Sequence, residues 1–253
     1  MNKRVALPLL ICLFYGTSLL AEHRVAPTQH KWIEVYAKQR NLPEPGDMLL
    51  NTDAEPDLTE GFVELYDGES LDGWVAYGGT CTFEPRGDAI VGTCVPGSPS
   101  TYLSTTKDDY RDFIFTVDVL WEVDGNTGVM FRSRVRDGEK GQVAFGPQAE
   151  MEDEAKQRFW SGGIYGQASG GWAYPLWLEG HEDARNAINR GEWNRLTIMA
   201  VGDTVKTWIN GVPAAHWETD EFREGFFGLQ VHSGKQGTIH FRAPRVRELI
   251  AEP

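Results

Sequence analysis

One carboxylate stands out as a candidate for acid–base chemistry in this sequence. Glu150 lies in the segment Gln148-Ala-Glu-Met-Glu152, in which polar and apolar residues alternate. Successive side chains of a β-strand point to opposite faces, so Met151 on the core face leaves Gln148, Glu150 and Glu152 on the other face. A carboxylate held in this way on a strand can act as a general base. Glu150 is therefore the first candidate for a base.

Two further segments present polar residues opposite the core by the same rule. In the segment 228–232 the apolar residues alternate with Gln230 and His232. In the segment 126–132 the same alternation places Arg132 on the face opposite the core. We expect these three strand faces to form one concave polar floor, which consists of Arg132, Gln148, Glu150, Gln230 and His232.

Each candidate also has a purely structural interpretation. Glu150 could serve only as an ion-pair partner of Arg132 across two strands, and His232 only as a polar surface residue. Tyr165 and Trp172 lie in Gly-rich stretches and could simply fix a loop. Because ionisable residues often prove structural, residue type and strand parity leave both interpretations open.

The segments that must position these residues are predicted to be strands of an all-β domain. From residue 61 onward the apolar residues recur with a period of two, most clearly over 113–123. Asn210-Gly211 is a strong signal for a two-residue hairpin. Many short alternating segments with Gly turns, and no alternation of strands with helices, predict an antiparallel sandwich or barrel. The Gly- and Trp-rich stretch 154–192 is expected to form long loops over one face.

The first 60 residues differ from the rest. Residues 1–21 combine a basic start, an apolar run and Ala21, the pattern of a secretory signal peptide. A membrane anchor would need about 20 clean apolar residues, which this run lacks. A lipoprotein site at Cys12 is the other alternative. Residues 22–60 predict a short helix within 30–40 and an acidic linker or strap. We expect a periplasmic or secreted protein without a transmembrane segment after removal of the signal.

Two cysteines remain after the signal peptide, and their spacing suggests a pair. Cys81 and Cys94 flank a segment with Gly87-Asp88 at its centre. A two-residue hairpin at that point places the two cysteines directly opposite each other, close enough for a disulfide. Export to an oxidising compartment would allow the bond to form. We therefore predict a structural disulfide between Cys81 and Cys94.

Composition limits the class of partner. The chain of 253 residues carries 24 Lys and Arg against 37 Asp and Glu, a formal net charge of −13. Such a charge repels phosphate backbones, so nucleic acid is not an expected partner. Nine Trp residues are consistent with sugar binding, since the flat indole face suits the CH-rich face of a pyranose ring. A carbohydrate is the expected ligand.

Seven motifs in the same order resemble a bacterial family first described only as a domain of unknown function. The family is now described as 3-keto-disaccharide hydrolase, or 3-keto-glucoside 1,2-lyase and hydratase. The resemblance covers about residues 61–249, and 61–250 is taken as one domain. It implies a fold similar to concanavalin A-like lectins and glucanases, an antiparallel jelly-roll β-sandwich. The motifs are Phe62-Val-Glu-Leu-Tyr-Asp-Gly-Glu-Ser-Leu-Asp-Gly-Trp74, Asn126-Thr-Gly-Val-Met-Phe-Arg132, Gly146-Pro-Gln-Ala-Glu150, Ser161-Gly-Gly-Ile-Tyr165, Gly191-Glu-Trp-Asn194, Thr207-Trp-Ile-Asn-Gly211 and Gly228-Leu-Gln-Val-His232.

The resemblance implies a substrate with a ketone at sugar C3, which acidifies the proton at C2. A base removes this proton, the C1 oxygen leaves, and water adds to the resulting enone. Glu150 is the candidate base, with His232 second. Arg132 would stabilise the enolate or hold a hydroxyl, and Tyr165 would be the acid. The candidates for substrate binding are Gln148, Gln230 and Trp172, the last as a stacking wall.

The sequence leaves two alternative functions and the need for a metal ion undecided. The scaffold could be a conventional glycoside hydrolase that uses Glu150 with Glu152 or Asp153, or a non-catalytic lectin-like module. No dinucleotide-binding fingerprint is present, and neither nicotinamide nor flavin is expected. Metal dependence is unknown. One divalent ion at Glu150 and His232 would stabilise an enediolate, although no known metal-binding motif occurs.

Overall fold

The computed structural model describes residues 23–39, 42–139 and 141–249. The predicted signal peptide lies outside the described residues and stays a prediction. Within the described residues, no helix has the length and apolar character that a bilayer crossing requires.

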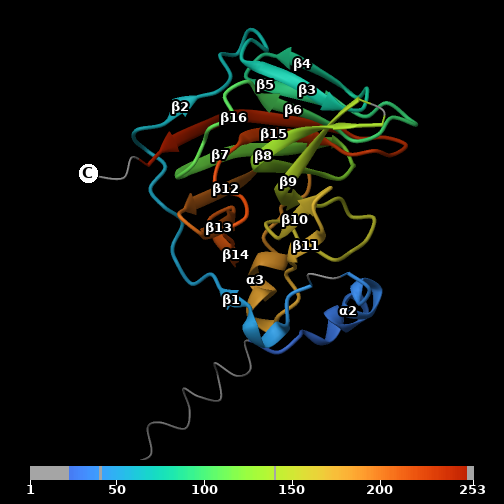
Figure 1. The fold of residues 1–253 in the computed structure, drawn as a ribbon, viewed down its shortest axis with the longest axis vertical. Helices are drawn as coiled ribbons and strands as arrows, with labels where there is room; N and C mark the ends of the chain where they lie inside the picture. Colours follow the sequence, from blue (N-terminus) through green and yellow to red (C-terminus); the bar gives the residue numbers. More distant parts are fainter. Residues whose placement is uncertain (1–22, 40–41, 140, 250–253) are drawn as a thin grey trace, which may run out of the picture.

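Two antiparallel β-sheets packed against each other make up most of this part of the chain (Figure 1). The predicted all-β antiparallel sandwich is therefore confirmed. Among the described residues, the first sheet has nine strands in the order β1 (Leu49–Leu50), β14 (Val212–Glu218), β13 (Thr204–Ile209), β12 (Asn194–Val201), β7 (Phe113–Val123), β16 (Thr238–Glu248), β5 (Ala89–Thr93) and β4 (Thr82–Arg86), with β2 (Val63–Glu64) paired to β16. The second has seven, in the order β11 (Gly171–Tyr174), β10 (Ile164–Gln167), β9 (Gly141–Met151), β8 (Thr127–Gly138), β15 (Phe226–Val231), β6 (Thr101–Thr105) and β3 (Trp74–Gly78).

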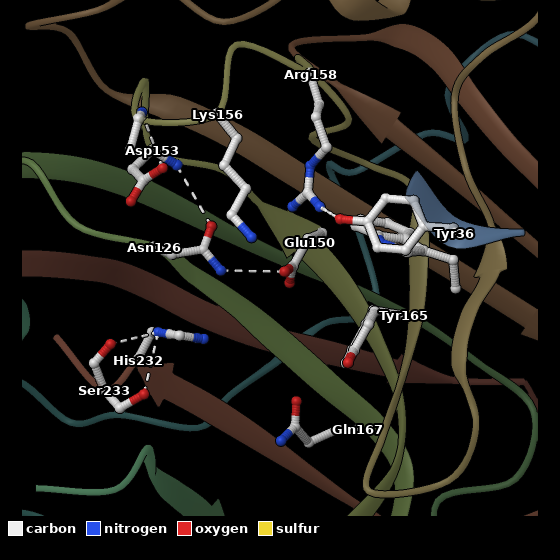
Figure 2. Close-up of a pocket in the computed structure, with 12 residues that line it drawn as sticks. Tyr36, Asn126, Glu150, Asp153, Lys156, Arg158, Tyr165, Gln167, His232 and Ser233 are labelled. Carbon is white, nitrogen blue, oxygen red and sulfur yellow. Dashed lines mark hydrogen bonds between the residues drawn. The ribbon is translucent and has the colours of Figure 1, made fainter. Parts of the chain in front are cut away.

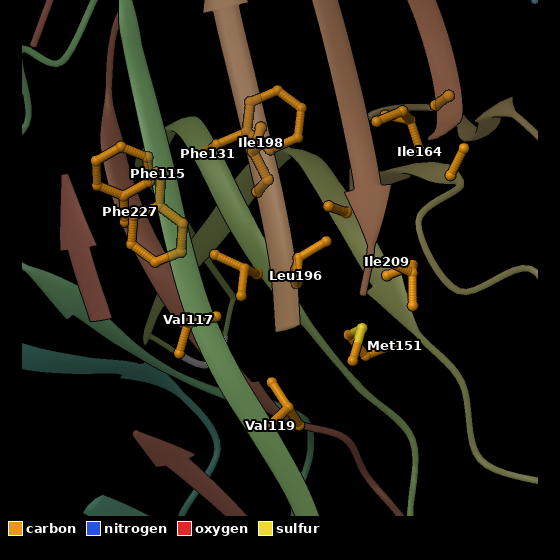
Figure 3. Close-up of a cluster of buried hydrophobic side chains, with 14 of the residues drawn as sticks. Phe115, Val117, Val119, Phe131, Met151, Ile164, Leu196, Ile198, Ile209 and Phe227 are labelled. Carbon is orange, nitrogen blue, oxygen red and sulfur yellow. The ribbon is translucent and has the colours of Figure 1, made fainter. Parts of the chain in front are cut away.

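The core lies between the two sheets and follows from the alternation in β7. Phe113, Phe115, Val117 and Val119 are buried, and the ring of Phe115 stacks on Phe227 of β15 at 4.4 Å between centroids (Figure 3). Each such side chain removed from water contributes roughly 1.5–3 kcal/mol. The two sheets are thereby fixed relative to each other, and the outer face of the second sheet has a rigid support.

Turn chemistry sets the register of the hairpins. Asn210 and Gly211 have φ of +52° and +84°, and Ile209 pairs with Val212 across them, as the sequence predicts for this dipeptide. The other predicted hairpin, at Gly87-Asp88, has the expected register, with Thr82 opposite Thr93.

The next pair along the β4–β5 hairpin is Cys81 and Cys94. The structure describes both as free, buried thiols and does not contain the predicted disulfide. Burial and the neighbouring Cys81 raise the pKa of the Cys94 thiol. The hairpin register thus brings the two thiols together, and the disulfide stays a prediction that an oxidation experiment can test.

The N-terminal part wraps around the sandwich. Helix α2 (His30–Tyr36) lies beside the end of the second sheet, preceded by a 3-10 turn at Pro27–Gln29 (Figure 1). The acidic stretch 51–60 crosses the outer face of the first sheet, where Glu55 accepts hydrogen bonds from Arg195 (3.0 Å) and Thr197 (2.6 Å). The remaining helical segments are 3-10 turns at Pro45–Asp47 and Glu179–His181 and the short helix α3 (Glu182–Arg185).

Candidate active site

A cavity of about 410 Å³ lies where the outer face of the second sheet meets helix α2 and the loop after β9 (Figure 2). This size falls within the range of about 300–1,000 Å³ that is common for small-molecule sites. Its polar and ionisable lining includes Tyr36 from α2, Asn126 before β8, Glu150 on β9, Asp153, Lys156 and Arg158 in the loop after β9, Tyr165 on β10 and His232 after β15.

Glu150 lies on the floor of this cavity and is held by strand pairing on one side. Its backbone N–H donates to the carbonyl of Gly163 (2.9 Å), and its own carbonyl accepts from Gly162 (2.8 Å). The carboxylate accepts hydrogen bonds from Asn126 Nδ2 (3.1 Å) and from Gln148 Nε2. The residue is only 5% exposed, so the carboxylate faces the cavity from a mostly buried position.

Burial has a strong effect on the protonation of Glu150. It raises the pKa of this carboxyl to about 7, and the charge of Glu152 adds to the increase. Hydrogen bonds from Asn126 and Gln148 and the positive charge of Arg158 act in the opposite direction. A group with a pKa near the working pH both accepts and returns a proton readily, which suits general acid–base catalysis.

Gln148 and Gln230 lie beneath Glu150 rather than in the cavity wall. Both are fully buried, and Gln148 Nε2 donates to Gln230 Oε1 (3.1 Å), while Gln230 Nε2 donates to the hydroxyl of Tyr102 (3.2 Å). Strand parity placed them correctly beside Glu150. Their role differs from the expected substrate binding, however, because fully buried amides orient the carboxylate instead of contacting a ligand directly.

Arg132 does not join this group, contrary to the expectation from parity. Its backbone has φ of +45° at a register shift between Met130 and Arg134, which marks a β-bulge. The extra residue redirects the side chain to the end of the sandwich. There the guanidinium, 1% exposed, donates to the carbonyls of Arg111 (2.7 Å) and Gly202 (2.8 Å). Arg132 is therefore a structural residue.

Arg158 is a cation of this site that the sequence analysis missed. It lies in the irregular stretch 154–192, where periodicity carries no information about direction. Its Nε donates to Glu152 Oε1 (2.7 Å), and Trp160 N donates to Glu152 Oε2 (2.9 Å). Glu152 is consequently buried in an ion pair below the cavity and is not free as a second reacting carboxylate. Burial raises the pKa of Glu152, and the Arg158 charge counteracts this rise.

Lys156 and Asn126 were also missed. Lys156 extends into the cavity and, among the described residues, has no hydrogen-bond or ion-pair partner (Figure 2). Asn126 opens a motif that the sequence analysis quoted, yet no periodic pattern singled it out. Its amide reaches Glu150 from the loop before β8, so the loop position rather than strand parity determines its contact.

Tyr165 and His232 lie in the cavity wall, as the sequence suggested, at two different depths. Tyr165 is half-buried, and burial, together with the Glu150 charge, raises the pKa of its hydroxyl, so the phenol keeps its proton at neutral pH. His232 is exposed at the mouth of the cavity, where its Nδ1 lies 2.6 Å from the carbonyl oxygen of Ser233. Tyr165 can therefore donate a proton from close to the floor, and His232 can do so only at the rim.

Trp172 differs from the expected stacking wall. It is 1% exposed. Its ring packs edge-to-face against Trp160 and Tyr165, with distances of 4.7 and 5.3 Å between the ring centroids. Its faces are therefore unavailable to a sugar ring, and its contribution is to support Tyr165 and the β10–β11 hairpin.

The described residues contain no group of three or more His, Cys, Asp or Glu side chains that could hold a metal ion. Glu150, Asp153 and His232 border the same cavity, but within the described part of the chain they are not grouped as a metal site.

Comparisons with known proteins agree with this fold. A family model described as a 3-keto-alpha-glucoside-1,2-lyase-like domain matches residues 61–247. Among curated proteins, no sequence matches this chain. A candidate glycosyl hydrolase from Parabacteroides distasonis ATCC 8503 has a similar structure, with a TM-score of 0.54, 17% identity, and coverage of 78% of this chain and 100% of the other. A Bacillus subtilis protein of unknown function with a galectin-like fold has a TM-score of 0.53 and 14% identity, and 76% of this chain and 100% of that chain are covered. These likenesses show a jelly-roll fold of the lectin type.

Proposed function

This chain belongs to the 3-keto-alpha-glucoside-1,2-lyase-like domain family, and on that premise we propose that it cleaves 3-keto-glycosides by elimination at C1 followed by hydration. Family membership supports a carbohydrate-related function. The finer assignment rests on one observation, the largely buried Glu150 carboxyl that faces a cavity of about 410 Å³ with its pKa raised to about 7.

The first step that we propose is removal of the C2 proton by Glu150. The C3 ketone makes this proton acidic, and the C–H electron pair becomes an enolate with its charge on the C3 oxygen. Lys156 borders the same cavity and has no ion-pair or hydrogen-bond partner within the described ranges, and its ammonium group is the candidate to stabilise that oxygen. Lys156 thus takes the role that the sequence analysis assigned to Arg132.

The second step expels the C1 substituent. The enolate returns its electron pair, the ketone re-forms, a double bond forms between C1 and C2, and the C1–O bond breaks. The departing oxygen takes a proton from Tyr165, whose hydroxyl stays protonated at neutral pH. Water then adds its oxygen to C1, the proton that this water gives up returns to the Tyr165 phenolate, and Glu150 returns its proton to C2. The sum of the steps is hydrolysis.

The two alternative functions differ from this proposal at Glu152 and Trp172. A conventional glycosidase needs two carboxylates at the cavity. Glu152 is engaged with Arg158 beneath the cavity, so this alternative relies on Asp153, which borders the cavity together with Glu150. A binding module of the stacking type needs an open aromatic face, whereas Trp172 is covered. Both alternatives serve as outcomes of the test.

The test measures release of the aglycone from a 3-keto-glucoside and from its unoxidised parent, each with and without a chelator. We expect release from the keto form alone, unaffected by the chelator. Glu150→Gln is expected to lower kcat at least about 100-fold, since a positioned general base contributes typically 10²–10⁴-fold. Glu154→Gln is the matched control, because Glu154 lies in the loop that follows β9 but is exposed and does not border the cavity.

Release from the unoxidised parent would instead indicate an ordinary glycosidase. Binding of either sugar without release from the keto form would indicate a lectin-like module. Full activity of Glu150→Gln would refute the assignment of the base, whichever substrate is cleaved.

A further inference from the structure

Residues 23–39 precede the matched family domain, yet they supply Tyr36 to the lining of the cavity. The side chain of Gln39 makes two hydrogen bonds to the backbone of Trp172. Its Oε1 accepts from the Trp172 N–H (2.8 Å), and its Nε2 donates to the Trp172 carbonyl (2.6 Å). Gln29 Oε1 accepts from Trp160 Nε1 (2.8 Å), and Gln29 is 3% exposed. This segment is therefore built into the site rather than loosely attached to it.

Helix α2 covers Arg158 with two aromatic rings. Trp32 and Tyr36 are four residues apart and hence on the same face of the helix. Together with Trp160 and Trp172 of the sandwich they form an aromatic box around the guanidinium, whose carbon lies 5.8, 5.8, 5.1 and 4.8 Å from the centroids of Trp32, Tyr36, Trp160 and Trp172. Contacts of this kind attract a cation to the faces of the rings.

The Tyr36 hydroxyl completes the fixation of Arg158. Nη1 of the guanidinium donates to this hydroxyl (Figure 2). Nε donates to Glu152. A guanidinium is planar, so acceptors on two of its nitrogens define the direction of the whole group. With both acceptors in place, the charge of Arg158 is held between Glu152 and the cavity that Glu150 faces.

We propose that Tyr36 is a positioning residue of the active site: its hydroxyl holds the Arg158 guanidinium against Glu152 and next to Glu150, and thereby sets the protonation of this carboxylate pair. The position of Arg158 is a structural claim, whereas its effect on turnover rests on the proposed function. The N-terminal segment is on this view a part of the site that the family domain alone does not supply.

The expected direction of the effect follows from charge. A cation beside two carboxyl groups favours their ionised forms, so a displaced Arg158 lets the pair retain its last proton to a higher pH. The pair titrates as a unit, and the prediction concerns the pH at which that last proton is lost. The other titratable groups that border the cavity or approach the pair are Tyr36 of α2, Tyr102 of β6, Tyr165 of β10, Asp153 and Lys156 of the loop after β9, and His232 after β15.

The experiment compares three substitutions on helix α2 in the full chain. Tyr36→Phe removes only the hydroxyl, and Tyr36→Ala also opens the aromatic box. Val35→Ala is the matched control, since Val35 neighbours Tyr36 in the chain but is 61% exposed. Carboxyl titration by ¹³C NMR on glutamate-labelled protein gives the highest Glu pKa, and the pH profile of kcat/KM for a 3-keto-glucoside gives its acid limb.

We expect the highest Glu pKa and the acid limb to move up together by about half a unit or more in Tyr36→Phe, further in Tyr36→Ala, and not at all in Val35→Ala. A structural role alone would lower the melting temperature without moving either titration. An unchanged Glu titration in folded Tyr36→Phe and Tyr36→Ala overturns the proposal. A shifted titration in a protein that cleaves no keto-glycoside leaves Tyr36 as the positioning residue and refutes only the proposed function.

Discussion

Replacement of Arg132 separates the role that its sequence position suggested from the role that its contacts indicate. The buried guanidinium donates to the carbonyls of Arg111, Gly202 and Phe222 and to the carboxylate of Asp112. Arg132→Met keeps much of the apolar volume but removes all these donors. We therefore expect a large loss of stability and, in the folded fraction, little loss of turnover.

The magnitude follows from burial. Removal of one partner from a buried charged network costs about 3–5 kcal/mol, because acceptors lose their donors inside the protein. Part of the Asp112 contact is discounted, since that side chain is one-third exposed. For a domain of this size a change of 1 kcal/mol shifts Tm by about 2–4 °C, so the expected decrease in Tm is about 6–20 °C.

Calorimetry or urea unfolding gives the stability, and kcat/KM on a 3-keto-glucoside below the transition gives the activity. Arg132→Lys is the second variant, because lysine keeps the charge but lacks the planar fork that reaches several carbonyls. We expect it to lose stability as well, although less. A Met variant with unchanged Tm and abolished turnover would refute this reasoning and return Arg132 to the reacting centre.

Three further predictions concern protonation, oxidation and export. The pKa of Glu150 is raised to about 7 in the fold, above its value of about 4.3 in the unfolded chain, so the stability due to its bound proton is complete below about pH 4.3 and is lost as pH rises through 7. About 4 kcal/mol of pH-dependent stability should therefore be absent in Glu150→Gln, as urea unfolding across pH can measure. Mild oxidation should join Cys81 and Cys94 in a disulfide, so that neither thiol can be titrated, and should stabilise the protein by about 3 kcal/mol. Two thiols that can still be titrated after oxidation and unfolding would contradict this prediction. In an exporting bacterial host, Edman sequencing of the mature protein should begin at Glu22, while retention of residues 1–21 would argue against the signal peptide.

Strand periodicity predicted what depends on two-residue alternation and failed where that alternation breaks. The face of Glu150, Gln148 and Gln230 followed from parity because β9 and β15 are regular at these positions. Arg132 follows a bulge, and one inserted residue reverses the direction that parity predicts. Its positive φ is uncommon for arginine, and no simple sequence pattern announces it.

Contacts between distant segments were the other limit. Tyr36 and Arg158 are 122 residues apart, and neither belongs to a strand whose partner could be read from alternation. Helix spacing places Trp32 and Tyr36 on one face of α2, yet this spacing gives no partner for that face. Their contact with Arg158 depends on how the helix packs against the sandwich, which the sequence pattern does not determine.

The aromatic box around Arg158 gives the cavity an optical property. Three of its four rings are indoles, and those of Trp160 and Trp172 lie 4.7 Å apart at 88°. Indole emission responds to nearby charge, and coupled indoles in a fixed chiral arrangement produce near-ultraviolet circular dichroism. A ligand that enters beside Arg158 changes the field at these rings, so the occupancy of the cavity can be followed by tryptophan fluorescence without any added label.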